Sequence, residues 1–304
     1  MKCIIFSKNQ SSESIVTDLH SVAKTFDIHV RDLRPVFSVR QLITISARGK
    51  GLVVNLGILK MVIGAHKVYL FNADHPEVYE GFIKNLKKSL DTNHGSLTPF
   101  EFIVLETALT QRFQKFKADY DIIEKDTEKA LRQSENTVSD EIIGTLLNLK
   151  KRLSNFETTV SEMNQSLMTA LEDEEELEDF YLSKKPENQD VEEIESVLEF
   201  FAEPTEDIVH KLEDLKENID DTQEFMNLKL SSLRNTIIRF DLIATFLTAI
   251  LAFMAFITGL YGMNVKNNIE ESFETFLLII LLLVTFGVIT FAWLWHYMKK
   301  RNIF

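Results

Sequence analysis

The sequence contains a single cysteine and fewer basic than acidic residues, and both shortages exclude classes of function. Cys3 is the only cysteine among 304 residues, which excludes an internal disulfide and a zinc site built from cysteines. Lysine and arginine number 33 against 46 aspartates and glutamates, so the net charge is −13. Because phosphate binding needs clustered basic side chains, no nucleic-acid partner is expected. The acidic balance suits a protein that handles cations.

The sequence motifs of common enzyme classes are also missing. There is no Walker A, GxGxxG, HExxH or GxSxG sequence, and no Ser/His/Asp grouping follows from spacing. We therefore do not expect an enzyme. The opening "MKCIIFSKNQ" has neither the apolar region of a secretory signal nor an Arg-rich amphipathic stretch, so no cleavable signal is expected. A presequence removed by processing would not be visible in this sequence.

Two long uncharged runs lie near the end of the chain. They are "LIATFLTAILAFMAFITGL" at 242–260 and "FLLIILLLVTFGVITFAWLWHY" at 276–297. A helix needs roughly 20 apolar residues to span the hydrocarbon core of a bilayer. We predict that both runs are transmembrane helices, so that membrane lipid surrounds this part of the protein.

The charges that flank these runs predict their orientation. Basic residues precede the first run and follow the second, at Lys229, Arg234, Arg239, Lys299, Lys300 and Arg301. The connecting loop holds one lysine against Glu270, Glu271 and Glu274. The positive-inside rule then places both termini on the cytoplasm-like side and the loop outside. The protein is expected to be a multi-pass membrane protein with a large inward-facing soluble part.

The soluble part begins with a mixed α/β region and continues as long helices. Short β-rich runs include "KCIIFSK", "DIHVRDL", "LITISARGKGLVVNLG" and "HKVYLFNA", with a hairpin at Gly49–Gly51 and helices near 14–25 and 77–90. A helix is predicted to start at Thr98 and Pro99, and another to cover about 138–182. The predicted segments are an α/β domain (1–97), a long-helix bundle (98–205), a stalk helix (206–241), the first span (242–260), an outer loop (261–275), the second span (276–297) and a basic tail (298–304).

The stalk carries apolar residues every three or four positions from Ile208 to Ile237, a heptad-like seam. One continuous helix is predicted, and it needs neighbouring helices or further copies of itself as partners. Continued towards and into the membrane, the same face forms a stripe whose residues within the predicted span are small or hydroxylated. This stripe consists of Arg234, Ile238, Asp241, Thr245, Thr248, Ala252, Ala255 and Gly259.

Two interpretations of the stripe are open. Small residues at this spacing commonly let helices pack closely. Alternatively, the stripe lines a narrow hydrated path, which is favoured by the charges of Arg234 and Asp241 at its inner end, since charges in or beside a membrane span often mark a functional path. Because two helices cannot enclose a pore, this interpretation requires a ring of subunits.

The stretch "YGMN", Tyr261–Asn264, ends the first of the two C-terminal runs and resembles the signature of the CorA superfamily of magnesium channels. Four further segments are similar, in order, to recurrent segments of its eukaryotic, mitochondrial-type branch. They are "VRDLRPVFS", "GLVVNLGILKMVI", "LTPFEFIVLETAL" and "RNTIIRFDL". The resemblance extends over essentially the full length of the chain.

This resemblance implies a homopentameric funnel with an α/β domain, long helices and a central pore lined by the first membrane helix. The transported ion would be Mg²⁺. The selectivity element of the family carries over onto Gly262, Met263 and Asn264, with Tyr261 as aromatic support. The expected location is the mitochondrial inner membrane, with the soluble part on the matrix side, if a presequence was removed, and otherwise another cellular membrane.

The chemistry of Mg²⁺ fits these residues. Mg²⁺ dehydrates reluctantly, so neutral amide oxygens of Asn264 can accept hydrogen bonds from its bound waters. Asp241 would act in the same way at the inner end. Glu270, Glu271 and Glu274 would raise the local cation concentration outside, although a plain solvated loop explains any one of them.

The densest acidic run, "EDEEELED", contains Glu172, Asp173, Glu175 and Glu176. As a hypothesis, Mg²⁺ bound there would hold subunits together and close the channel. A solvated helix end explains the same run, and the sequence alone favours that explanation. Two other functions also stay open, namely a transporter of Zn²⁺, Co²⁺ or Ni²⁺ and a non-conducting coiled-coil scaffold anchored in the membrane.

Overall fold

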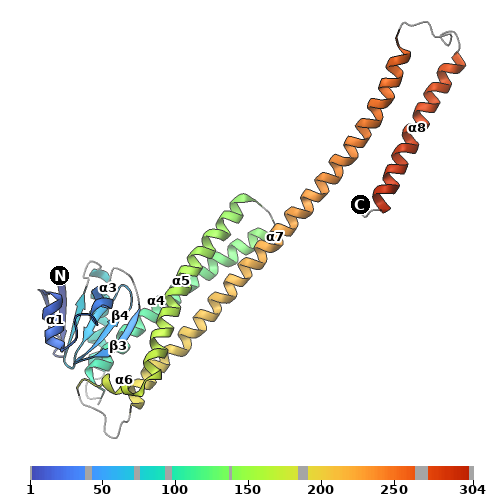
Figure 1. Ribbon diagram of the computed structural model, residues 1–304. Helices are drawn as coiled ribbons and strands as arrows, with labels where there is room; N and C mark the ends of the chain where they lie inside the picture. The colour runs from blue at the N-terminus through green and yellow to red at the C-terminus, as the bar shows by residue number, and fades with distance from the viewer. Residues whose placement is uncertain are drawn as a thin grey trace. The chain divides into compact units, whose positions relative to one another are not determined.

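A computed structural model describes residues 2–37, 43–71, 76–92, 98–136, 139–183, 191–263 and 273–300 (Figure 1). The chain divides into two compact units, Met1–Gln223 and Glu224–Phe304.

The first unit begins with one six-stranded antiparallel sheet in the order β2-β1-β6-β5-β4-β3. Its strands are β1 (Lys2–Ser7), β2 (Ser12–Val16), β3 (Thr44–Arg48), β4 (Gly51–Asn55), β5 (Lys60–Ile63) and β6 (Lys67–Phe71). The predicted hairpin is β3–β4. Gly49 in its turn has a φ of +59°, and a Cβ there would lie 2.2 Å from the carbonyl oxygen of Asp27. Only glycine fits this close approach without strain.

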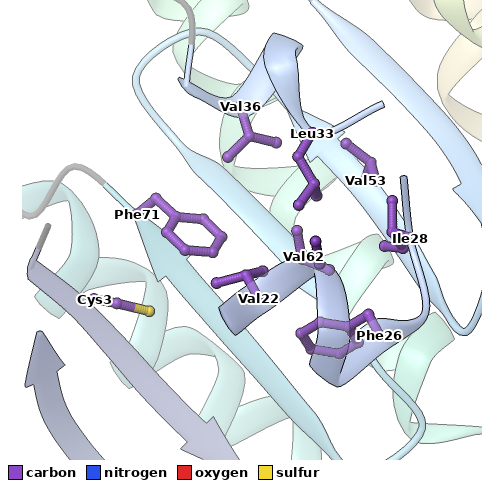
Figure 2. Close-up of a cluster of buried hydrophobic side chains, with 10 residues drawn as sticks. Cys3, Val22, Phe26, Ile28, Leu33, Val36, Val53, Val62 and Phe71 are labelled. Carbon is purple, nitrogen blue, oxygen red and sulfur yellow. The ribbon is translucent and has the colours of Figure 1, made fainter. Parts of the chain in front are cut away.

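Alternate side chains of the central strands enter two separate cores, since successive residues of a strand point to opposite faces. One core lies under α1 (Leu19–Phe26) and α2 (Arg34–Phe37), as Figure 2 shows. Its buried residues include Cys3, Val22, Phe26, Leu33, Val36, Val53, Val62 and Phe71. The neighbours of Val53 and Val62 along the strands, such as Leu52 and Met61, are equally buried on the opposite face. On that face, helix α4 (Phe100–Asn136) contacts β5.

In the sheet region of this unit, two local predictions were wrong and one strand was missed. Residues 28–33 of the expected strand "DIHVRDL" form turns that lead into α2. The expected helix at 14–25 begins only at Leu19, where the Asp18 carboxylate caps the backbone N–H of Ser21 at 3.1 Å. The residues before it pair as β2 on the edge of the sheet. Strand β5 was not predicted, although all four of its residues are buried.

The long helices follow as α3 (Pro76–Thr92), α4 (Phe100–Asn136), α5 (Asp140–Glu172) and α6 (Glu174–Asp179). The single helix expected over 138–182 is therefore two helices. Asp173 ends α5 and caps α6, because its carboxylate accepts hydrogen bonds from the backbone N–H groups of Glu175 and Glu176. Such a side-chain cap fixes where a helix starts.

Helix α7 (Glu192–Tyr261) is 70 residues long and contains Pro204. It begins before residue 206, where the stalk was predicted to start. Ile194, Leu198 and Phe201 are buried in the first unit. Packing of this kind keeps the helix continuous through a proline that would break an isolated one.

The second unit contains the end of α7 and all of α8 (Phe273–Lys300), which run in opposite directions (Figure 1). Both helices are long and apolar enough to cross a membrane, judged by length and composition. Helix α8 extends the expected second run at both ends. The segment between the helices is therefore shorter than the outer loop predicted at 261–275.

Candidate functional site

The contact between α7 and α8 identifies the face of α7 that packs within the chain. A Cβ placed on Gly287 would lie 3.2 Å from the sulfur of Met254, and the rings of Phe253 and Phe286 are 5.4 Å apart. The half-buried residues of α7 in this region are Leu242, Ile243, Phe246, Ile250, Met254 and Ile257. They recur every three or four positions, so they form one side of the helix.

The stripe of small and hydroxylated residues lies on the other side of α7. All eight of its members, from Arg234 to Gly259, are exposed within the chain. Successive residues of an α-helix are turned by about 100°, which places Thr248, Ala252 and Gly259 roughly opposite Ile250 and Met254. Close packing against α8 therefore does not explain the stripe.

The charges at the end of the hairpin that is remote from Tyr261 also separate by face. Arg239 lies on the side of α7 that carries Ile250, whereas Asp241 belongs to the opposite, stripe side. Residues two apart on a helix do not face each other, so this arginine is poorly placed to neutralise Asp241. Arg234 is exposed on the stripe side as well.

Helix α7 ends within the stretch "YGMN". Tyr261 is its last residue, and the backbone N–H groups of Gly262 and Met263 donate to the carbonyls of Thr258 and Leu260 at 3.0 and 3.4 Å. The Met263 side chain is exposed. The chain thus leaves the helix where the sequence places its glycine.

Part of the predicted site lies outside the described residues, namely Asn264, Glu270 and Glu271. Their roles stay predictions. Glu274 is described and lies in the first turn of α8.

The acidic residues at the end of α5 have different structural roles. Glu172, Asp173, Glu175 and Glu176 line, with Thr169, an open depression of about 630 Å³. Asp173 is the helix cap, and Glu176 forms an ion pair of 2.8 Å with Arg48 of β3. Over the described ranges, no three His, Cys, Asp or Glu side chains are arranged to hold a metal ion. A regulatory site here stays a prediction.

The contact at Gly287 was not predicted. The sequence did contain an indication of this contact, because a lone glycine inside an apolar helical run commonly marks the close approach of another helix. The sequence could not show which residue of α7 would meet it.

Comparison with known proteins agrees with the fold and extends the resemblance. Residues 2–234 match the model of the family described as magnesium transporter MRS2-like. The solved structure of the CorA magnesium transporter from Methanocaldococcus jannaschii superposes with a TM-score of 0.62 over 97% of both chains. At 16% identity this likeness concerns the fold alone. The predicted fold class, an α/β domain followed by long helices and two C-terminal apolar helices, is confirmed.

Curated relatives cover most of the chain. The magnesium transporter MRS2-4 of Arabidopsis thaliana is 25% identical, with 93% of this chain and 82% of the relative aligned. The mitochondrial inner membrane magnesium transporter mrs2 of Schizosaccharomyces pombe is 28% identical, with 89% and 68% aligned. Together with the family match, these relatives confirm the resemblance to the mitochondrial-type branch of the CorA superfamily. The chain belongs to the magnesium transporter MRS2-like family.

Proposed function

We propose that this protein transports Mg²⁺ across a membrane. Its family and the relatives named as magnesium transporters support this function. The two apolar helices support a location in the membrane. The mitochondrial inner membrane is the location we propose, on the names of relatives such as that of Schizosaccharomyces pombe, with both termini and the soluble part on the matrix side.

The transport path is a channel formed by a ring of copies, which we take to be five. The observation that carries this proposal is the placement of the stripe on α7 opposite the face that meets α8. Each copy can then turn its stripe towards a shared axis while α8 packs behind it. Thr245 and Thr248 would offer oxygen atoms to a hydrated ion, and Ala252, Ala255 and Gly259 would leave it room.

Selectivity is proposed to arise where α7 ends. Gly262 would allow the backbone to leave the helix, while Met263 and Tyr261, both exposed within one chain, would pack against apolar neighbours and support the turn in the assembled ring. Amide oxygens of Asn264 from each copy would accept hydrogen bonds from the waters of a hexahydrated Mg²⁺. Such a ring holds the ion without removing its water, so the ion is bound weakly enough to leave.

Charges at the inner end would modulate the flux. Asp241 from each copy would form an acidic ring that attracts Mg²⁺ through its bound waters. Arg234 on the same side would oppose a passing cation. We expect Arg234→Gln to increase Mg²⁺ flux at low ionic strength, and an unchanged or lower flux would place Arg234 away from the path.

The soluble part is proposed to sense internal Mg²⁺ through the acidic run. Glu172 and Glu175 are both exposed, and neither caps a helix or forms an ion pair among the described residues. We expect the double substitution Glu172→Gln and Glu175→Gln to leave flux high when internal Mg²⁺ is raised. Normal inhibition by internal Mg²⁺ in this variant would locate the sensor elsewhere.

The test of the function is ion flux into proteoliposomes with an imposed negative interior. Wild type is compared with Asn264→Ala, and Asn268→Ala is the matched control because it removes the same side chain from the same segment. We expect wild type and Asn268→Ala to conduct Mg²⁺ and Asn264→Ala to lose or change selectivity. A folded oligomer that passes no Mg²⁺ would contradict transport, and flux of Zn²⁺, Co²⁺ or Ni²⁺ in place of Mg²⁺ would change the assigned ion.

A further inference from the structure

The antiparallel pairing of α7 and α8 brings basic residues from distant parts of the chain to one end of the hairpin. Met254 lies beside Gly287. Thirteen positions further along α8 is Lys300, and thirteen positions back along α7 is Asp241. Met298, two residues before the end of α8, is buried at 4% exposure, so the pairing persists to this level. Arg239 of α7 and the lysines Lys299 and Lys300 of α8 therefore lie at the same end of the hairpin, the end remote from Tyr261.

Two pairs of stacked aromatic rings precede these lysines on α8. Phe291 and Trp295 have ring centroids 6.3 Å apart at an angle of 25°, and Trp293 and Tyr297 are 5.8 Å apart at 20°. The members of each pair are four residues apart, so each pair forms a short ladder along the helix. The two tryptophans are exposed at 64% and 47%, and the tyrosine at 45%.

The ladders lie on the two flanks of α8, beside the face that meets α7. At about 100° per residue, Trp295 falls on one side of the line through Gly287 and Leu294, and Trp293 falls on the other. Lys299 follows Trp295 by four residues, and Lys300 follows Tyr297 by three. Each ladder therefore ends at a lysine on its own flank, and both lysines are exposed in the last turn of α8.

We propose that this end of α8 binds an anionic membrane phospholipid. The lipid phosphate lies at Lys299 or Lys300, and the part of the acyl chain nearest the headgroup lies along the adjacent aromatic ladder. Indole and phenol rings favour the boundary between headgroups and hydrocarbon, where one edge of the ring is wet and its body is apolar. A lysine near an anionic membrane surface attracts lipid phosphate, and Arg239 adds a third positive charge. The proposal requires that α8 lies in a membrane, but it does not require Mg²⁺ flux.

The chain carries its own reporters for this site. Trp293 and Trp295 are its only tryptophans, and both belong to the ladders. Bromine atoms on the acyl chain of a phospholipid quench tryptophan fluorescence on contact. The full-length protein is reconstituted into phosphatidylcholine vesicles that contain the same mole fraction of brominated phosphatidylglycerol or brominated phosphatidylcholine. We expect stronger quenching by the anionic lipid.

Charge variants test whether the two lysines cause the preference. The double substitution Lys299→Gln and Lys300→Gln is expected to reduce the relative affinity for the anionic lipid about five-fold for each lysine, equivalent to about 1 kcal/mol each near the surface. Lys229→Gln is the matched control, because this exposed lysine lies on α7 ten residues before Arg239, about 15 Å along the helix. The control is expected to keep the wild-type preference.

Three results would overturn the proposal. Equal quenching of the wild type by both brominated lipids would show bulk lipid contact without selection of the headgroup. Absence of quenching by either lipid would show that protein, such as a second copy, covers the ladders. An anionic preference that survives in the double variant would place the headgroup elsewhere. A non-conducting protein that still prefers the anionic lipid would contradict the proposed transport and leave this inference intact.

Discussion

The two units of this chain use the same apolar residue types in opposite ways. Phe82 of α3 is fully buried, whereas Phe256 of α7 is 62% exposed. From residue 224 to the end of the described chain, only Met226 and Met298 are buried apolar residues. The first unit completes its core within one chain. The second unit leaves its apolar surface for lipid or for further copies, which is the arrangement expected where the solvent is itself apolar.

Polar groups differ in the same way. In the first unit, the buried Glu101 carboxylate joins distant segments, since it accepts hydrogen bonds from the backbone N–H groups of Leu182 and Ser183. In the second unit, hydroxyl groups bond within their own helix, as Thr248 does to the Ala244 carbonyl and Thr290 to the Phe286 carbonyl. A membrane helix must satisfy its polar groups locally. Tertiary hydrogen bonds therefore stabilise the first unit far more than the second.

The largest expected effect concerns the reactivity of Cys3, which lies in the core of the first unit. Burial raises the pKa of its thiol to about 12 from an ordinary value of 9.0. At pH 8 we expect alkylation at least about 10³-fold slower than in the unfolded chain, because the reagent needs unfolding of a stable core. Because the folded pKa is the higher one, the neutral thiol stabilises the fold below pH 9, and this contribution is lost as pH rises from 9 towards 12.

Mass spectrometry of alkylated protein measures this rate. The control is Ser232→Cys in a Cys3→Ser background, which places the thiol on an exposed position of α7 in the second unit. It should react at the rate of a free thiol. Equal rates at the two positions would remove the contrast between the units.

The next largest effect is expected from a matched pair of phenylalanine substitutions, one in each unit. We expect Phe82→Ala to lower the free energy of unfolding of the first unit by about 3–5 kcal/mol, since it leaves a cavity in a packed core. Phe256→Ala removes the same atoms from an exposed position and should leave the first unit unchanged. Denaturant unfolding of the purified protein, followed by circular dichroism, provides the comparison. Similar losses from both substitutions would show that the units unfold together.

The contact within the membrane hairpin is expected to give a smaller effect. Gly287→Leu places a side chain where Met254 already lies 3.2 Å from a Cβ, and such overpacking costs about 1–3 kcal/mol. Disulfide trapping between Phe253→Cys and Phe286→Cys in a Cys3→Ser background should fall several-fold. Val288→Leu, at a neighbouring exposed position, should leave trapping unchanged. Undiminished trapping in Gly287→Leu would mean that α8 does not depend on this glycine.

The smallest expected effect on the free energy of unfolding concerns a partly exposed ion pair in the first unit. Arg48 and Glu176 join β3 to α6, and the arginine side chain is 46% exposed. We expect Arg48→Gln to cost at most about 1 kcal/mol in unfolding experiments at low salt and less at high salt, because solvent and ions screen the pair. Lys24→Gln on α1 is the control, since this residue is also exposed. A decrease in the free energy of unfolding well above about 1 kcal/mol would contradict this expectation and show that the pair stabilises the fold despite its exposure.

The sequence alone determined the features that depend on local pattern. Two uncharged runs predicted the apolar helices of the second unit. The glycine turn predicted the β3–β4 hairpin, and "YGMN" with its flanking segments led to the family that the comparisons confirm. These features follow from composition and spacing over a few to about 20 residues, without knowledge of distant neighbours.

Only the tertiary structure decided which residues meet. Residues 28–33 turn under the sheet because α1 and α2 cover it, and α7 continues through Pro204 because its first turns are buried in the first unit. The periodicity of α7 showed that its faces differ, but both faces carry residues able to pack against another helix. The contact of Met254 with Gly287 assigned one face to α8 and left the stripe free. The physical reason is that a hydrophobic pattern specifies what a helix can bury, whereas the neighbours supplied by the fold determine where it is buried.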